Sequence, residues 1–331
     1  MAEDLYGGIF MKTFWLAAIL AIAPSLAVAQ APRCPASATV PSKSDLPHLL
    51  MTSQDRGFLW KATKDGHTSW LYGTVHASRE EWLMPGPLIR SAILQSQAVA
   101  LELNLQDPQT LAALRKPEEP ANREKLIASG RKKKLDALAD ELCIPTAGFA
   151  TTAIGLEAAG LSASAARADG YYPDYAVDFV LQGMAGSLKK EVIALEDVQT
   201  QRNLLISPRL SEENAFIDET IKQISSGEAR KDEDQLIAMW GRSDLTRLNQ
   251  YKQWCKCERT PEEKRQTLRM VDERNAAMAQ KILTLHDSGK SLFVAVGSLH
   301  MAGPEGLPAL LKKDGFDVQQ IVPAPSAKTS L

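Results

Sequence analysis

The sequence lacks the motifs of the commonest nucleotide-dependent and serine-dependent enzymes. Its 331 residues contain no Walker loop, no dinucleotide-binding glycine fingerprint, no H-E-x-x-H helix and no G-x-S-x-G elbow. An excess of one charge is missing too, because 38 Lys and Arg residues oppose 40 Asp and Glu residues. No basic face with interleaved aromatic residues appears, so we expect no nucleic-acid partner.

A long hydrophobic run is also missing. The longest apolar stretch, 13–23, is about half of the ~20 residues that a membrane span needs. It follows Lys12 and ends before the small residues Ala27-Val28-Ala29, which is the pattern of a secretory signal peptide. We therefore expect a signal peptide over 1–29, with an upstream extension over 1–10 and cleavage near Ala29-Gln30. The mature chain would be periplasmic or secreted, without a stable membrane span.

Cysteine is rare, and its position matters because of the predicted export. All four cysteines (Cys34, Cys143, Cys255 and Cys257) follow the signal peptide. In an oxidising compartment an even number of cysteines indicates one or two structural disulfides. Three pairings are possible, and a metal or redox pair at Cys255 and Cys257 is the alternative.

The mature chain has the composition of a folded globular protein, with 44% hydrophobic and 24% charged residues overall. We expect a lead-in segment (30–55), a single domain (56–322) and a tail (323–331). Strand-like runs alternate with helical patterns, and the middle, 105–285, is mostly helical. This order predicts an α/β fold (α+β with a mixed central sheet and a large helical insertion). The candidate strands are 58–62, 69–73, 98–103, 191–195, 291–297 and 316–322.

One short motif, Gly-x-x-His, occurs twice, each time directly after an apolar run. The first copy is Gly73-Thr74-Val75-His76, and the second is Gly297-Ser298-Leu299-His300. Functional groups in an open α/β sheet collect at the carboxyl ends of the strands. We therefore expect two imidazoles, from only five histidines in the chain, at the same edge of the sheet. Because imidazole is a common metal ligand, a shared cation is the natural reason for the pair.

Carboxylates stand at the corresponding place on two other strands. Glu102 interrupts the apolar run 98–101, and Glu196 follows 192–195. Two histidines and one glutamate form a ligand set of catalytic zinc sites, in which the metal lowers the pKa of a water to about 7. Either glutamate is a candidate ligand, and the other is a candidate proton acceptor. Each residue taken alone also has a structural interpretation, as a hydrogen-bonded core histidine, an ion-pair partner or a helix start.

At these residues the chain resembles the TraB/PrgY/GumN family and its animal relatives, the Tiki proteins. The blocks LWKATKDGHTSWLYGTVHAS and FVAVGSLHMAGPEGLPALLKKDGF look like the GumN branch, and the similarity runs from about Phe58 to Ile321. The resemblance implies an EreA/ChaN/Tiki-like core and a divalent metal ion (Mn, Co or Zn) held by His76, His300 and Glu102. Tiki-like members are metal-dependent proteases, reported with manganese or cobalt.

Two further positions are weaker candidates. Arg274-Asn275 resembles an Arg-Asn pair often seen before the second motif of the family. Arg274 would clamp a substrate carboxylate or hold Glu196 in a bidentate pair, and a purely structural arginine is the alternative. Asp178 is interpreted as an ordinary helix residue rather than as a partner of the site.

The function expected from this reasoning is an exported, divalent-metal-dependent hydrolase acting on an amide bond of a peptide or protein. Its proposed catalytic residues are Glu102, Glu196 and Arg274. One alternative is a non-catalytic, metal-containing binding or regulatory protein of the cell envelope. Another is a metal-independent ester hydrolase of the erythromycin-esterase type. The sequence gives no indication of the natural substrate or the oligomeric state.

Overall fold

The computed structural model describes residues 34–255 and 257–324, which belong to one compact unit beginning at Cys34. The predicted signal peptide (1–29), the start of the lead-in segment and residues 325–331 of the tail lie outside the described residues. None of the helices in the described part has the length and hydrophobicity of a membrane span.

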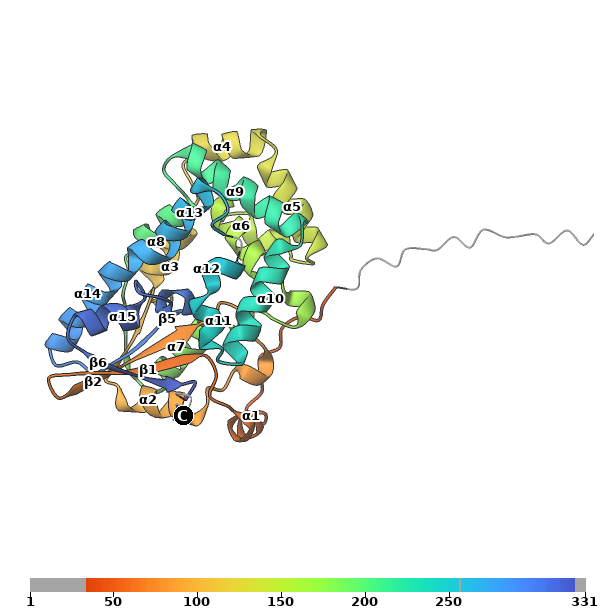
Figure 1. Cartoon of the computed structure of the whole chain (residues 1–331). Helices are drawn as coiled ribbons and strands as arrows, with labels where there is room; N and C mark the ends of the chain where they lie inside the picture. The colour runs from red at the N-terminus through yellow and green to blue at the C-terminus, as the bar shows by residue number, and fades with distance from the viewer. Residues whose placement is uncertain (1–33, 256, 325–331) are drawn as a thin grey trace, which may run out of the picture. The chain divides into compact units, whose positions relative to one another are not determined.

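A mixed six-stranded sheet lies at the centre of the fold, in the order β4-β3-β5-β2-β1-β6 (Figure 1). The four strands β4, β3, β5 and β2 run parallel to one another, whereas β1 is antiparallel to both β2 and β6. The fold class predicted from the sequence is therefore confirmed. The strands are β1 (Phe58–Lys64), β2 (His67–Thr74), β3 (Ala98–Leu101), β4 (Glu191–Ala194), β5 (Leu292–Gly297) and β6 (Asp317–Val322).

The hairpin of β1 and β2 forms because its turn has the necessary chemistry. Lys64 pairs with His67, which leaves only Asp65 and Gly66 to reverse the chain. Both turn residues have a positive φ (51° and 78°), and Asp-Gly is a preferred sequence for this type of two-residue turn. The hairpin directs β2 toward its carboxyl end at Thr74, two residues before His76.

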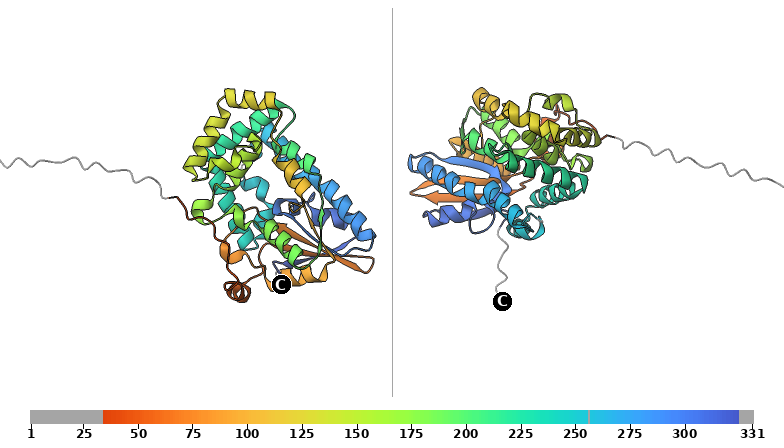
Figure 2. Two further views of the ribbon diagram at one scale, coloured as in Figure 1. Left: turned by 180° about the vertical axis from the view of Figure 1, so that it is seen from behind. Right: turned by 90° about the horizontal axis from the view of Figure 1, so that it is seen from above.

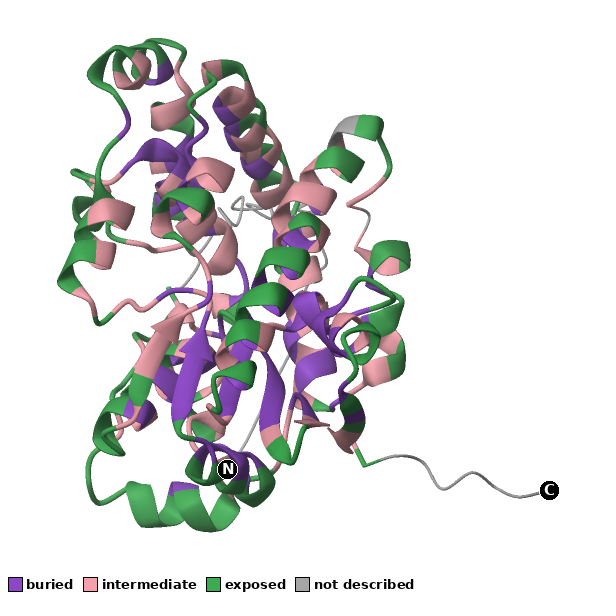
Figure 3. Cartoon of the chain, turned by 90° about the vertical axis from the view of Figure 1, so that its left-hand side faces the viewer, coloured by how far each residue is buried: buried purple, intermediate pink, exposed green. Residues whose placement is uncertain are grey.

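The central strands are buried because helices cover them. All four residues of β3 and the first five of β5 are buried, and their runs of small and branched apolar residues fit a parallel strand covered on both faces. α7 (Val177–Ser187) packs against β3, β4 and β5, and α15 (Leu307–Lys313) packs against β1 and β6. Figure 3 shows the buried residues concentrated in these strands, whose arrowheads point toward the helical part of the chain.

Most of the middle of the chain is helical and gathers beyond the carboxyl ends of the parallel strands (Figure 2). A second apolar cluster, centred on Leu126, Leu135, Ile154 and Ile217, holds this part together. The remaining α-helices are α1 (Leu46–Thr52), α2 (Pro87–Gln95), α3 (Pro108–Arg115), α4 (Pro120–Ala128), α5 (Arg131–Glu141), α6 (Ile154–Ala163), α8 (Val198–Leu205), α9 (Leu210–Ser225), α10 (Glu228–Gly241), α11 (Leu245–Asn249), α12 (Tyr251–Trp254), α13 (Pro261–Thr267) and α14 (Glu273–Asp287).

Two of these helices were not anticipated from the sequence. α1 lies inside the segment expected to be an irregular lead-in, and α4 lies where the sequence indicated no element. Each has a proline in its first turn, where the missing N–H costs no hydrogen bond. In both cases only a single residue is buried, so the apolar periodicity that reveals a helix in a sequence is weak.

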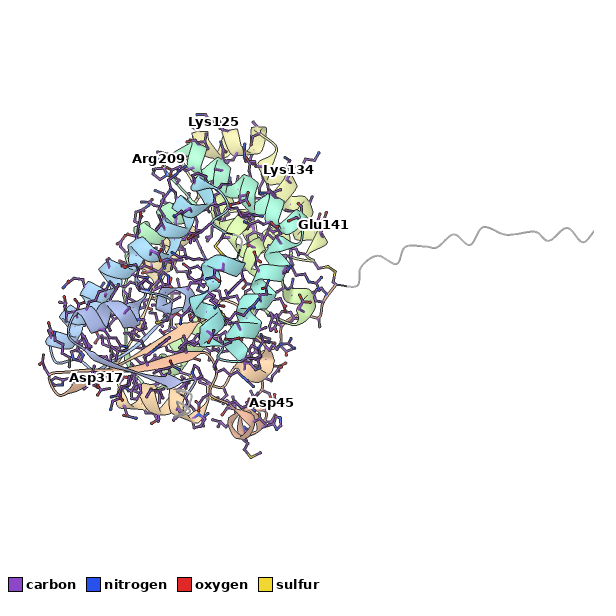
Figure 4. The ribbon with its side chains drawn as sticks, viewed as in Figure 1. Asp45, Lys125, Lys134, Glu141, Arg209 and Asp317 are labelled. Carbon is purple, nitrogen blue, oxygen red and sulfur yellow. A yellow bond between two sulfur atoms is a disulfide. The ribbon has the colours of Figure 1, made fainter. Side chains whose placement is uncertain are left out.

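The basic start of α5 lies on the surface of the helical part, where Figure 4 shows Lys134 and Glu141 among its outward side chains. Arg131 pairs with Asp218, and Lys132 pairs with Asp136 and Glu157. Because acids neutralise these two cations, the run is a solvated helix surface.

Two disulfides account for all four cysteines. Cys34 pairs with Cys143 across 109 residues, with the Cα atoms 5.6 Å apart. Cys255 pairs with Cys257, with the Cα atoms 5.1 Å apart. The expectation of structural disulfides is confirmed, and the structure selects one of the three pairings. The first bridge ties the lead-in segment to the end of α5.

Candidate functional site

The two Gly-x-x-His motifs lie side by side because their strands are parallel neighbours. β2 pairs with β5 in a register that places Thr74 opposite Gly297. The segments that follow β2 and β5 therefore leave the sheet at the same edge, as the sequence predicted. A Cβ atom on Gly73 would lie 2.9 Å from Ser298 Oγ, so only glycine allows the two motif segments to approach this closely.

Three candidate ligands converge at Gly297. A Cβ atom built on this glycine would lie 3.3 Å from Glu102 Oε1, 3.7 Å from His300 Cδ2 and 3.8 Å from His76 Nε2. His300 Nε2 and Glu102 Oε1 are 3.9 Å apart. The structure thus brings together residues that are more than 200 positions apart in the sequence.

Each imidazole is held by its Nδ1 atom. His76 Nδ1 lies 3.1 Å from Asp178 Oδ2, and His300 Nδ1 lies 2.7 Å from Asn275 Oδ1. Asn275 donates from Nδ2 to the Glu305 carbonyl oxygen (2.8 Å), which orients its amide so that Oδ1 accepts from His300. Both histidines consequently carry their proton on Nδ1 when neutral, and the Nε2 lone pair is free for a ligand.

The interpretation of Asp178 as an ordinary helix residue was wrong. Asp178 is the second residue of α7, and its side chain reaches the His76 ring. The α7 backbone also holds the motif, since the Val177 N–H donates to the Val75 carbonyl oxygen (3.0 Å). Helical periodicity alone does not show this contact, because it depends on where α7 packs against the sheet.

An arginine links the two glutamates. Arg274 donates from Nε to Glu196 Oε1 (2.7 Å) and from Nη2 to Glu196 Oε2, which is the bidentate pair considered from the sequence. Arg274 Nη2 also donates to Glu102 Oε2 (2.6 Å), and Gln201 Nε2 donates to both carboxylates (2.8 Å each). Glu102 Oε1 accepts the Gly297 N–H (2.8 Å). The network leaves Glu102 Oε1 on the side of the histidines.

The network also determines the charges of the central groups. Burial raises the pKa of Glu102, but His300, Arg274 and His76 together lower it to about 2. Burial lowers the pKa of His300, against the opposing charge of Glu102, so this ring is neutral near pH 7. The nearby Asp178 carboxylate raises the pKa of His76 to about 10. Burial opposes the charge of Arg274, yet Glu196 and Glu102 raise its pKa above the ordinary value.

A cavity of about 480 Å³ opens over these residues. Its floor includes Thr74, His76 and Glu102, and its walls come from the helical part, where Phe216, Leu236 and Trp254 are among the lining residues. The His76 side chain is 59% exposed, whereas Glu102 and His300 are 16% and 5% exposed. Solute in the cavity therefore reaches His76 most easily.

A model of the TraB/PrgY/gumN family matches residues 58–320, which include both motifs and the residues of the network. The chain belongs to the TraB/PrgY/gumN family. The match is to the family as a whole, so assignment to the GumN branch stays a prediction. No curated protein and no solved structure matches the chain at a significant level.

The resemblance implies a divalent metal in the site of this TraB/PrgY/gumN protein. Within residues 34–255 and 257–324, no three His, Cys, Asp or Glu side chains are arranged closely enough to hold a metal ion as they stand. The donor types nevertheless fit, because His76 Nε2 and Glu102 Oε1 both lie within 4 Å of a Cβ atom built on Gly297, and His300 Nε2 lies 3.9 Å from Glu102 Oε1. The Nδ1 partners fit as well, since metal-binding histidines usually donate their other N–H to a carboxylate or carbonyl oxygen.

Sequence reasoning missed two members of the site. Gln201 lies on α8, five residues after Glu196, and binds both glutamates. Glu233 on α10 lines the cavity, and burial raises its pKa to about 7 while the charge of His76 lowers it. Neither residue follows a strand or belongs to a motif, so nothing in the local sequence distinguishes it from other helix residues.

Proposed function

We propose that this TraB/PrgY/gumN protein is an exported, divalent-metal-dependent hydrolase that cleaves an amide bond in a peptide. The convergence of His76, Glu102 and His300 on one point beneath an open cavity carries the proposal. The two disulfides support export, because such bonds persist in oxidising compartments.

In this proposal His76 Nε2, His300 Nε2 and Glu102 Oε1 hold the metal. The ion would supply Lewis acidity and a water of lowered pKa. Asp178 and Asn275 hold the two rings so that their Nε2 atoms face the cavity. Arg274 keeps Glu102 ionised and fixes its orientation. We assign Glu196 to the support of Arg274, because both of its oxygens accept from the guanidinium.

The cavity favours a small or extended substrate. Its volume of about 480 Å³ lies within the usual range of small-molecule sites, roughly 300–1,000 Å³. Apolar side chains such as Phe216, Leu236, Trp254 and Met270 are among those that line it. A short peptide segment with an apolar side chain fits this lining, whereas a folded domain does not fit inside the cavity.

The first experiment measures metal content. The purified mature protein is dialysed, reloaded with Mn, Co or Zn, and compared with its His76→Ala/His300→Ala variant by elemental analysis. We expect about one ion per chain, lost in the variant, because two imidazoles supply ligands, with the His76 ring releasing its Nε2 proton as the metal binds. A His48→Ala/His67→Ala variant is the matched control, since both of these histidines are exposed. A well-folded wild type that holds no ion under any loading would overturn the proposal.

The second experiment separates the proposal from its alternatives. The loaded protein is incubated with panels of short peptides and of esters, with and without a chelator. Peptide cleavage that is lost on chelation supports the proposal. Ester cleavage that survives chelation would replace it with metal-independent ester hydrolysis. Tight peptide binding without turnover, retained in the metal-free His76→Ala/His300→Ala variant, would replace it with a binding function.

A further inference from the structure

Thr74 lies at the floor of the cavity and carries a hydroxyl group. The residue ends β2, is 1% exposed and lines the cavity together with His76 and Glu102. Its Oγ1 atom is buried and has no hydrogen-bond partner among the described residues. Leaving a buried hydroxyl unpaired is costly, and isosteric valine would avoid that cost. The position therefore carries a polar group for which the described part of the chain provides no hydrogen-bond partner.

The second motif shows the contrast. Ser298 occupies the position in Gly297-Ser298-Leu299-His300 that Thr74 occupies in the first copy. Its hydroxyl donates to the Thr74 carbonyl oxygen (2.8 Å) and ties the two motif segments together. The Ser298 hydroxyl thus has a structural partner, whereas the Thr74 hydroxyl has none within residues 34–255 and 257–324.

Thr74 lies beside the residue at which the candidate ligands converge. Thr74 and Gly297 are paired in register, so they lie side by side on strands about 5 Å apart. Gly297 is the residue around which Glu102, His300 and His76 gather.

The backbone around Thr74 is held by the surrounding structure. Trp240 Nε1 donates to the Gly73 carbonyl oxygen (2.7 Å), and Ser298 Oγ donates to that of Thr74. The Val177 N–H donates to the Val75 carbonyl oxygen (3.0 Å). A donor held in place before the reaction stabilises developing charge without reorganisation at that moment.

Three other donors close to the convergence point already have acceptors. The Gly297 N–H donates to Glu102, and the Arg274 guanidinium donates to Glu102, Glu196 and the Met270 carbonyl oxygen. Asn275 donates to the Glu305 carbonyl oxygen. A substrate carbonyl oxygen needs a donor, and the Thr74 hydroxyl still has a proton to give.

We infer that the Thr74 hydroxyl donates a hydrogen bond to the carbonyl oxygen of the bond that is cleaved. It acts where that oxygen gains negative charge as water adds to the carbonyl carbon. This assignment rests on the proposed hydrolase function. It makes Thr74 a catalytic residue of the first motif that binds substrate, in contrast to His76, which binds the metal in the proposal.

The test uses Thr74→Val, which keeps the shape and removes the hydroxyl, and Thr74→Ser, which restores it. Thr220→Val is the matched control, because Thr220 lines the same cavity but donates its hydroxyl to the Phe216 carbonyl oxygen (2.9 Å). Metal content is measured first. Affinity for a phosphinic dipeptide with apolar side chains, whose anionic oxygens imitate the tetrahedral state, is then measured by calorimetry.

We expect Thr74→Val to bind the phosphinic dipeptide roughly 10- to 100-fold more weakly, as for loss of a hydrogen bond to a charged oxygen. The metal content of Thr74→Val should be unchanged. Thr74→Ser and Thr220→Val should bind the phosphinic dipeptide with an affinity within about threefold of that of the wild type. Thr74→Val should unfold at the same or a higher temperature, because it loses an unpaired buried hydroxyl. A purely structural hydroxyl would instead lower the melting temperature.

The possible failures are distinguishable. If the wild type holds metal and binds the dipeptide, but Thr74→Val binds it equally well, the inference about Thr74 is overturned and the hydrolase proposal stands. If the wild type holds no metal, the hydrolase proposal itself fails, and the Thr74 assignment fails with it.

Discussion

Replacement of Gly297 by alanine should separate the candidate centre from the stability of the fold. Gly297 has φ −48° and ψ 137°, a backbone conformation that alanine also adopts. The added methyl group would point into the space between the candidate ligands, 3.3 Å from Glu102 Oε1 and 3.8 Å from His76 Nε2. The substitution therefore disturbs the centre without requiring a new backbone conformation.

The expected effects differ in size. A Gly-to-Ala change at a compatible position stabilises a protein by about 0.4–1 kcal/mol through the unfolded chain. The close approach to Glu102 offsets part of this gain, since one of the two atoms must shift by a few tenths of an ångström. We expect the free energy of unfolding to stay within about 1 kcal/mol of wild type. Metal affinity should fall roughly 10- to 100-fold, as it does when ligand orientation is disturbed.

The assay combines urea denaturation with metal titration of the same samples. Gly183→Ala is the matched control, because Gly183 lies on α7 with no atom within 4 Å of an added Cβ. This control should be more stable by about 0.5–1 kcal/mol and should bind metal like the wild type. If Gly297→Ala binds metal with unchanged affinity, the three residues around Gly297 do not form the metal site.

Two other predictions concern stability. Replacing Cys34 and Cys143 by serine should lower the free energy of unfolding by up to about 4.7 kcal/mol. Replacing Cys255 and Cys257 by serine should lower it by only about 1.6 kcal/mol. The difference arises because a long closed loop restricts the unfolded chain more than a three-residue loop does. Urea denaturation checks this order, and a larger loss for the second pair would contradict it. Glu213 is 1% exposed, and its two carboxylate oxygens have no hydrogen-bond partner among the described residues. Burial, helped by the charge of Glu118, raises the pKa of Glu213 from 4.5 to about 7. The folded state then binds the extra proton, so wild-type stability should fall as the pH rises from about 4.5 to 7. Glu213→Gln should remove this decline and be more stable by up to about 3 kcal/mol at pH 8, and equal slopes of stability against pH would refute the assignment.

The strands were predictable from the sequence because their signals are local. The run 292–296 is apolar throughout, as a strand covered on both faces requires, and Asp65-Gly66 marks the hairpin by turn chemistry alone. The shared edge of the two Gly-x-x-His motifs was also predictable, because both motifs follow strands and parallel strands end on the same side.

The partners of the site were not predictable in the same way. Asp178, Gln201 and Asn275 lie on helices, where their spacing indicates only a polar position. Their contacts with His76, Glu102 and His300 depend on how α7, α8 and α14 pack against the sheet. The pairing of the cysteines likewise depended on the distance between Cys34 and Cys143 in the folded chain.

The sequence by itself determined the fold class, the strands and the edge at which His76 and His300 meet, because hydrophobic periodicity and turn chemistry act between neighbouring residues. Only the tertiary structure decided that Arg274 joins Glu102 to Glu196 and that Asp178 and Asn275 hold the two imidazole rings. It also decided that the Thr74 hydroxyl has no partner among the residues that the structure describes. These contacts join residues up to 172 positions apart, so they arise from packing, which no local pattern encodes.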